Sequence, residues 1–184
     1  MNWKRYAETA ARIRVPSGFG LLAVYVVWAR PAAISVALGA AVALLGILLR
    51  AYAAGHLEKN QRLATTGPYA YTRNPLYLGS ALVALGLAIA ARIWWLGLLF
   101  AAYLIAVYWP VVREEEARLA ELFPEFSRYA AAVPRFWPAG RRGAAAVYSG
   151  ASSGFRWTLY WKNQEYNALL GYLFGLAVLI WKML

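Results

Sequence analysis

The sequence contains no cysteine and no aspartate, and it has a single histidine, His56. Without cysteine the chain forms no disulfide, no thiolate nucleophile and no cysteine-based metal site. One histidine excludes a metal centre built from several imidazoles, and the lack of aspartate excludes a Ser–His–Asp triad. Acidic residues are scarce altogether, because eight Glu face nineteen Lys and Arg, which gives a formal net charge of +11. We therefore expect no resident metal ion.

Apolar residues, in contrast, are abundant. They make up 62% of the chain, and aromatic residues make up 16%, whereas soluble domains are roughly 45–50% apolar. The composition predicts an all-α integral membrane protein, organised as a single membrane domain over residues 1–184. The short chain and its high Ala and Arg content favour the inner or plasma membrane of a prokaryote.

About five transmembrane helices are expected, since a span needs about 20 mostly apolar residues, or about 17 at the short end. Arg92 alone separates the third from the fourth, which predicts a tight hairpin. Residues 1–15 are basic, lack the apolar core of a signal peptide and predict an interfacial segment. Three glycines inside the first two spans, Gly20, Gly39 and Gly46, suit close helix packing. The expected spans are Pro16–Ala29, Pro31–Ala53, Pro75–Ala91, Ile93–Val112 and Glu165–Leu184.

The charges predict an orientation for these spans. Five spans place Arg30, Arg92 and Lys182 on one side of the membrane, and the other sixteen Lys and Arg on the opposite side with all eight Glu. The positive-inside rule makes the second side cytoplasmic, with the N-terminus inside and the C-terminus outside. The net charge then indicates attraction to anionic membrane lipids. No nucleic-acid partner is expected, because the basic residues are spread over several loops.

Two substantial loops face the cytoplasm in this topology, Gly55–Asn74 and Arg113–Gln164. Within the second, residues 114–129 have the apolar spacing of one helix. Pro134 and Pro138 then favour an extended stretch, so a helical and extended segment is expected on the cytoplasmic side. Residues 139–164 predict a linker to the last span.

The first loop carries a Gly-Pro-Tyr turn and an Arg-Asn-Pro turn in the stretch TTGPYAYTRNPLYLG. Pro68 and Pro75 restrict the backbone, which allows such a loop to be held rigidly against a ligand. The tyrosine rings suit a flat heterocycle, Arg73 suits a carboxylate, and a Glu suits a ribose or an ammonium group. This combination fits a zwitterionic nucleoside such as S-adenosylmethionine.

Each residue type also has a simpler interpretation. Tyrosines serve as interfacial anchors, and Arg73 can extend to lipid head groups. Glu115 and Glu116 suit the start of a helix. Arg135 can contact a lipid phosphate, and His56 can be an ordinary interfacial residue near a helix end.

Two long motifs add a family resemblance. The stretch LATTGPYAYTRNPLYLG and the stretch EEARLAELFPEFSRYAAAVPRFWP, from Glu115 to Pro138, occur in this order with a helical hairpin between them. Together they resemble the isoprenylcysteine carboxyl methyltransferase and phospholipid methyltransferase superfamily, over about residues 50–138. The resemblance implies an integral membrane methyltransferase with its core over residues 55–138 and its active site facing the cytoplasm. It implies S-adenosyl-L-methionine as cofactor.

The resemblance also implies site residues. Arg73, Glu116 and Arg135 match the family's catalytic positions. The residues at positions that match the family's cofactor-binding site are Gln61, Leu63, Ala64, Tyr69, Arg73, Asn74, Tyr77, Glu115 and Glu116.

Two positions depart from the family pattern. Asn74 stands where the family has His, so it can donate and accept hydrogen bonds but cannot titrate. Asn74 can therefore still bind the cofactor, but it cannot act as a general acid or base. Gln61 stands where the family often has a second His, two residues before the leucine.

The sequence is compatible with several methyl acceptors. Candidates are a prenylated cysteine, a phospholipid amine, and a small isoprenoid or other lipid carboxylate or hydroxyl, each reaching the site from the bilayer. A different class of function is a sterol-reductase-like enzyme that uses NADPH, and another is a non-catalytic membrane scaffold. The oligomeric state is left open.

Overall fold

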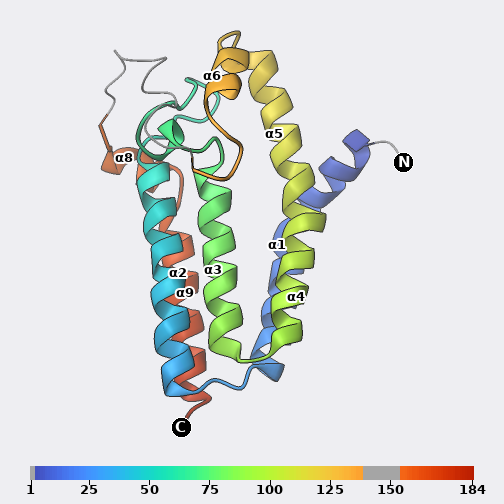
Figure 1. Cartoon of the computed structure of the whole chain (residues 1–184), viewed down its shortest axis with the longest axis vertical. Coiled ribbons are helices and arrows are strands. Elements are labelled where there is room, and N and C mark those ends of the chain that lie inside the picture. Colours follow the sequence, from blue (N-terminus) through green and yellow to red (C-terminus); the bar gives the residue numbers. More distant parts are fainter. Residues whose placement is uncertain (1–2, 139–153) are drawn as a thin grey trace.

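The computed structural model describes residues 3–138 and 154–184, and it contains no strand within these ranges. Figure 1 shows the long helices running side by side, with the loops of interest gathered at one end. The predicted all-helical class is thus confirmed for the described residues. The elements in order are α1 (Trp3–Trp28), α2 (Ala33–Ala54), the 3-10 turn η1 (Gly67–Ala70), α3 (Pro75–Ala91), α4 (Trp94–Tyr103), the π-helical turn η2 (Leu104–Tyr108), α5 (Trp109–Leu122), α6 (Phe126–Ala132), α8 (Trp157–Lys162) and α9 (Tyr166–Trp181).

Two helices are long and apolar enough to cross a membrane by themselves: α2, and the continuous helix Trp94–Leu122 formed by α4, η2 and α5. A bent α1 would be a third, whereas α3 and α9 are apolar but shorter. These helices support an integral membrane protein, and the count of five spans stays a prediction.

The N-terminal boundary differs from the predicted one. Residues 1–15 and the first span were expected as separate segments, but α1 runs through both. Its halves, Arg5–Ile13 and Pro16–Trp28, meet at an angle of 51°. Proline lacks the backbone N–H and clashes with the preceding turn, so Pro16 bends the helix without ending it.

Three charged residues gather at one end of the helices, as the charge pattern predicted. The Arg30 N–H donates to the Ala91 carbonyl at 3.0 Å, and Lys182 Nζ donates to the Val26 carbonyl at 2.5 Å. Arg92 forms the predicted hairpin between α3 and α4, with a left-handed φ of 56°. The other end holds the loop after α2, η1, and the start of α3 (Figure 1).

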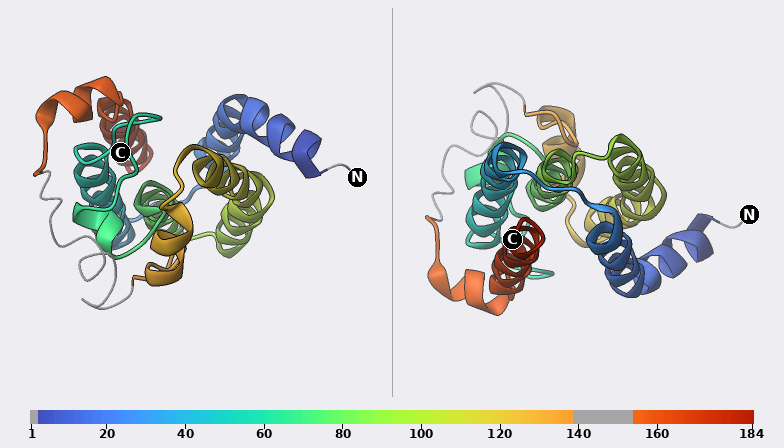
Figure 2. Two further views of the ribbon diagram at one scale, coloured as in Figure 1. Left: turned by 90° about the horizontal axis from the view of Figure 1, so that it is seen from above. Right: turned by 90° about the horizontal axis from the view of Figure 1, so that it is seen from below.

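Seen along the helices, α3 lies between α2 and the α4–α5 helix, and α1 and α9 lie on the same face of this row (Figure 2). The α2–α3 contact depends on glycine. A Cβ on Gly39 or Gly86 would overlap the backbone of the facing helix, as would one on Gly46 or Gly79. The predicted close packing is therefore right for Gly39 and Gly46. It is wrong for Gly20, where a Cβ would meet nothing within 4 Å.

The helix expected over residues 114–129 is in fact two helices. α5 ends at Leu122, Phe123 is extended, and α6 begins at Phe126. Pro124 follows Phe123 and disfavours a helical conformation there, which explains the break. The break lets α6 turn back over the η1 loop, where Tyr129 packs with Leu63.

The predicted linker 139–164 is partly helical. Residues 139–153 lie outside the described residues, but α8 covers Trp157–Lys162. The Arg156 N–H donates to the Gly55 carbonyl at 3.0 Å, and Asn163 Nδ2 donates to the carbonyls of Ala54 and Leu57 at 3.0 and 2.9 Å. α8 therefore caps the C-terminal end of α2 and holds the start of the following loop.

Candidate active site

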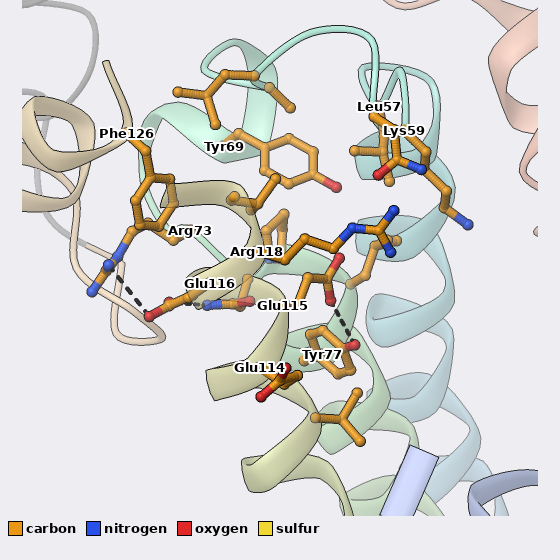
Figure 3. Close-up of a pocket in the computed structure, with 18 of the residues that line it drawn as sticks. Leu57, Lys59, Tyr69, Arg73, Tyr77, Glu114, Glu115, Glu116, Arg118 and Phe126 are labelled. Carbon is orange, nitrogen blue, oxygen red and sulfur yellow. Dashed lines mark hydrogen bonds and ion pairs between the residues drawn. The ribbon is translucent and has the colours of Figure 1, made fainter. Parts of the chain in front are cut away.

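A cavity of about 450 Å³ lies where the two sequence motifs meet. Its walls come from α1, the loop after α2, η1, the start of α3, α5 and α6. The continuous helix Trp94–Leu122 has 29 residues, about 44 Å at the usual rise, whereas the hydrocarbon core is about 30 Å thick. The α5 part of the cavity can therefore stand outside that core. Figure 3 shows Tyr69 approaching this space from one wall and Glu115 and Arg118 from α5.

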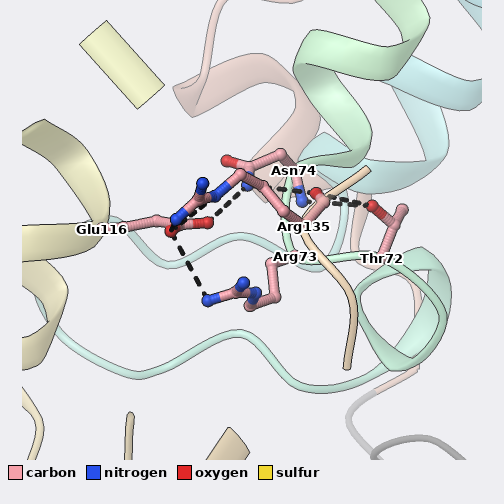
Figure 4. Close-up of polar contacts among 5 residues, drawn as sticks. All are labelled: Thr72, Arg73, Asn74, Glu116 and Arg135. Carbon is pink, nitrogen blue, oxygen red and sulfur yellow. Dashed lines mark hydrogen bonds and ion pairs between the residues drawn. The ribbon is translucent and has the colours of Figure 1, made fainter. Parts of the chain in front are cut away.

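Glu116 is the centre of a buried polar cluster (Figure 4). Its Oε1 accepts a hydrogen bond from Asn74 Nδ2 at 2.9 Å. Its Oε2 accepts from Arg135 Nε and Nη2 at 2.9 and 2.7 Å, and from Arg73 Nη1 at 3.5 Å. Two guanidinium groups and an amide thus share one carboxylate, which leaves the cluster with an excess positive charge.

The same cluster ties the two motifs together through the backbone. The Arg73 N–H donates to the Pro134 carbonyl at 2.9 Å. The Arg135 carbonyl accepts from Thr72 Oγ1 at 3.0 Å and from Asn74 Nδ2 at 3.2 Å. The Arg-Asn-Pro turn is therefore fixed against the Val-Pro-Arg segment, about sixty residues later in the chain.

Arg73 carries the clearest sign of a missing partner. Its Nε is buried and has no hydrogen-bond partner among the described residues. A buried donor without a partner costs free energy, typically about 1–3 kcal/mol. Since Arg73 also lines the cavity, an acceptor brought by a ligand would relieve this cost.

Tyr69 forms part of the cavity wall from η1 and is buried. Burial, and secondarily the charge of Glu115, raises the pKa of the Tyr69 hydroxyl well above its usual range. Its backbone carbonyl accepts a hydrogen bond from Tyr129 Oη at 2.8 Å. The ring is thus a neutral surface, held in place by α6.

The acidic residues on α5 differ in their surroundings. Glu115 Oε2 accepts a hydrogen bond from Tyr77 Oη at 2.8 Å, and Glu115 is exposed. Glu114 and Arg118 also line the cavity. Glu115 remains accessible to a ligand, whereas Glu116 is occupied by its three partners.

The turn before η1 depends on glycine and on the single histidine. Gly67 has a positive φ of 58°, and a Cβ there would lie 2.6 Å from the ring of His56. His56 is buried, and its Nδ1 lies 3.1 Å from Thr66 Oγ1. The imidazole of His56 thus packs against the backbone of the turn at Thr66 and Gly67.

Eight of the ten predicted site residues line the cavity, namely Leu63, Ala64, Tyr69, Arg73, Asn74, Tyr77, Glu115 and Glu116. Gln61 is exposed and is not part of the lining. Arg135 is also outside it, bound to Glu116, with its guanidinium carbon 5.2 Å from the centre of the Trp109 ring.

Sequence reasoning missed several lining residues. Arg118 is one helical turn after Glu114 and Glu115, so helical spacing was a usable signal for it. Ala7, Glu8 and Ala11 come from the first half of α1, and nothing in their local sequence indicates a site. The described residues contain no group of three or more His, Cys, Asp or Glu side chains placed to hold a metal ion.

Comparison with known proteins assigns this arrangement to a family. The phospholipid methyltransferase family matches residues 34–125, from α2 to just before α6. The chain belongs to this family of membrane methyltransferases. The predicted resemblance is therefore confirmed, and Arg135, α8 and α9 fall outside the matched region.

Two curated relatives are also similar. The cobalt-zinc-cadmium resistance protein CzcN of Cupriavidus metallidurans is 33% identical over 156 residues, which cover 83% of this chain and 68% of that protein. The nickel-cobalt-cadmium resistance protein NccN of Alcaligenes xylosoxydans xylosoxydans is 36% identical over 81 residues, covering 44% of this chain and 38% of that protein. No solved structure matches the chain significantly.

Proposed function

We propose that the protein transfers a methyl group from S-adenosylmethionine to a lipid acceptor drawn from the bilayer, at a site facing the cytoplasm. The observation that carries the proposal is the cavity shared by both motifs, into which Arg73 brings a buried Nε without a partner. Ligand cavities commonly measure about 300–1,000 Å³, and this one is within that range.

The donor set of the cavity fits such a cofactor. Arg73 provides a cationic donor for a carboxylate, and Glu114 and Glu115 provide anionic acceptors for an ammonium group or ribose hydroxyls. Tyr69 provides an uncharged ring for a heterocycle. When bound, the cofactor would supply an electrophilic methyl group on a sulfonium.

The residues divide into two roles under this proposal. Tyr69, Arg73 and Glu115 contact the ligand and exclude water. Glu116, Asn74 and Arg135 are positioning residues, because their polar groups already bind one another. Alignment of reactants can itself lower a barrier by several kcal/mol, and an uncharged amine or a carboxylate acceptor needs no strong base.

Calorimetry with S-adenosylhomocysteine on the purified full chain tests the proposal. We expect binding in the wild type, and at least about tenfold weaker binding in Tyr69→Ala and Arg73→Gln, about 1.4 kcal/mol each. Arg128→Gln is the matched control, since Arg128 is exposed on α6 outside the cavity lining. Binding of NADPH in place of S-adenosylhomocysteine would overturn the proposal in favour of a reductase, and binding of neither would favour a scaffold.

A further inference from the structure

A second cavity of about 530 Å³ lies between the helices, framed by α1, α2, α3, the α4–η2 helix and α9. We call it the interhelical cavity. Arg50 is the one charged residue among the described residues that line it. α9 forms one wall with Gly171 and Gly175, where a Cβ would meet nothing within 4 Å. The space is therefore open to a chain of apolar ligand atoms.

The charged and amide side chains that line the interhelical cavity lie at one end of it. Arg50, Ser80 and Asn167 lie near the helix ends that carry the site loops. Leu87, Phe100 and Val178 line it near the opposite ends of their helices. A ligand with a polar head and a long apolar tail matches this gradient.

The charge of Arg50 is matched within the protein. Its Nε and Nη2 donate to the two carboxylate oxygens of Glu165 at 3.0 and 2.8 Å. Its Nη1 donates to Ser80 Oγ at 2.6 Å and to the Leu76 carbonyl at 3.3 Å. The Glu165 side chain is 9% exposed and that of Arg50 is 23% exposed, so water screens the pair only partly. The polar end therefore has polar groups but no net charge.

This end adjoins the candidate active site. Leu76, whose carbonyl binds Arg50, lines the site cavity. Tyr77 of the site cavity packs edge-on against Tyr108 of the interhelical cavity, with ring centres 5.8 Å apart. The two cavities therefore adjoin at Leu76 and Tyr77, on the side of the interhelical cavity that holds Arg50.

We propose that the interhelical cavity binds a single-chain lipid with an uncharged head group, and that the Glu165–Arg50 pair excludes lipids with an anionic head. A carboxylate head at this end would meet Arg50, whose charge is already matched by Glu165, and burying an anion without an unmatched cation is costly. Identification of the bound lipid as the methyl acceptor rests on the proposed function. The proposal then narrows the acceptors to uncharged nucleophiles, with an uncharged lipid amine, which needs no base to accept the methyl group, favoured over a lipid carboxylate.

The test compares two probes of equal chain length, radiolabelled hexadecanol and palmitate, bound to the full chain in nanodiscs at pH 8. The wild type should bind hexadecanol at least about tenfold more tightly than palmitate. Glu165→Gln leaves Arg50 with an unmatched charge and should lower this ratio by about tenfold or more. Glu121→Gln, an exposed change on α5, should leave the ratio unchanged.

A second pair of variants tests the location. Gly171→Phe places a ring in the interhelical cavity and should weaken both probes by about tenfold or more. Gly20→Phe is the matched control, because a Cβ at Gly20 also meets nothing within 4 Å but lies outside the cavity lining.

Any one of three results would overturn the proposal. These are equal binding of the two probes to the wild type, an unchanged affinity ratio in Glu165→Gln, and unaffected binding in Gly171→Phe. S-adenosylhomocysteine affinity, measured on the same samples, separates the two hypotheses. If that ligand binds and hexadecanol does not, only the lipid proposal fails. If it does not bind while the hexadecanol preference holds, the proposed function fails and the lipid site stands.

Discussion

The two cavities place their buried charges in opposite ways. Beside the site cavity, Glu116 is shared by Arg73 and by Arg135, which lies outside the lining, so this cluster keeps one unmatched positive charge. In the interhelical cavity Arg50 and Glu165 match one to one. An excess charge beside a cavity favours a charged ligand, whereas a matched pair favours an uncharged one. If both proposals hold, two ligands of different chemistry meet near Tyr77, where the two cavities adjoin.

The largest expected effect comes from breaking the Glu116 cluster. Glu116→Gln would leave two partly buried guanidinium groups without a counter-charge, and loss of one partner of a buried ion pair typically costs about 3–5 kcal/mol. We expect a large fall in the midpoint of thermal unfolding in detergent, with loss of S-adenosylhomocysteine binding. Glu121→Gln, exposed on the same helix, is the control and should unfold like the wild type.

Glu165→Gln breaks the matched Arg50–Glu165 pair and leaves the Glu116 cluster intact. It should leave S-adenosylhomocysteine affinity within about threefold of the wild type, below about 0.7 kcal/mol. If Glu116→Gln and Glu165→Gln reduced this affinity equally, the two cavities would not be functionally distinct.

The next effect concerns Asn74, which donates to both Glu116 and the Arg135 carbonyl. Asn74→Leu removes both bonds and should weaken S-adenosylhomocysteine binding or stability by about 1–3 kcal/mol. Asn74→His keeps one donor toward Glu116 and should leave affinity within about tenfold, roughly 1.4 kcal/mol. Calorimetry on the two variants measures this difference, and equal affinity of the Leu variant and the wild type would reduce Asn74 to a turn residue.

A smaller effect is expected at Asn163, outside the family match. Its side chain donates to the carbonyls of Ala54 and Leu57, and Leu57 lines the site cavity. Asn163→Ala should lower stability by about 1 kcal/mol, because two carbonyls lose a partner at a partly exposed position. Denaturant titration measures the loss, with Asn167→Ala on the neighbouring helix as control. An unchanged midpoint in Asn163→Ala would show that α8 does not hold the loop.

The smallest effect is expected from pH acting on Tyr69. Because its pKa is raised in the folded protein, the folded state keeps the proton while the unfolded chain releases it near the usual value of about 10. The contribution of Tyr69 to stability is therefore present below about pH 10 and lost above it. Unfolding midpoints of the wild type and Tyr69→Phe should differ by a constant amount between pH 7 and 9 and converge at higher pH. A divergence that starts near neutral pH would contradict the assignment.

Much of the helix pattern followed from local sequence. The apolar segments all became helices, Arg92 formed the tight hairpin, and Arg30 and Lys182 came to the same end of the bundle. These features depend on residue type within one segment, or on segment length. Two errors occurred where one proline decides between bending and ending a helix, at Pro16 and Pro124. A third is α8, which lies in the segment expected to be a linker.

The site residues were predictable as a set but not in their roles. The motifs indicated Glu115 and Glu116 as a pair, whereas the structure leaves Glu115 accessible and buries Glu116 in contacts. Their neighbouring positions point in different directions from one helix, so only one can meet Arg135 from the later segment. The contribution of α1 to the cavity had no local signal at all.

Composition, periodicity and short motifs are enough to assign the membrane class, the family, the helical segments and eight of the residues that line the site cavity. Which charges are matched depends, in contrast, on contacts between distant segments. Asn74 and Glu116 are 42 residues apart, and Arg50 and Glu165 are 115 apart. Such pairs form only when helix packing brings distant segments within hydrogen-bond distance. The close α2–α3 contact and the return of α9 alongside α2 therefore set the charge of each cavity.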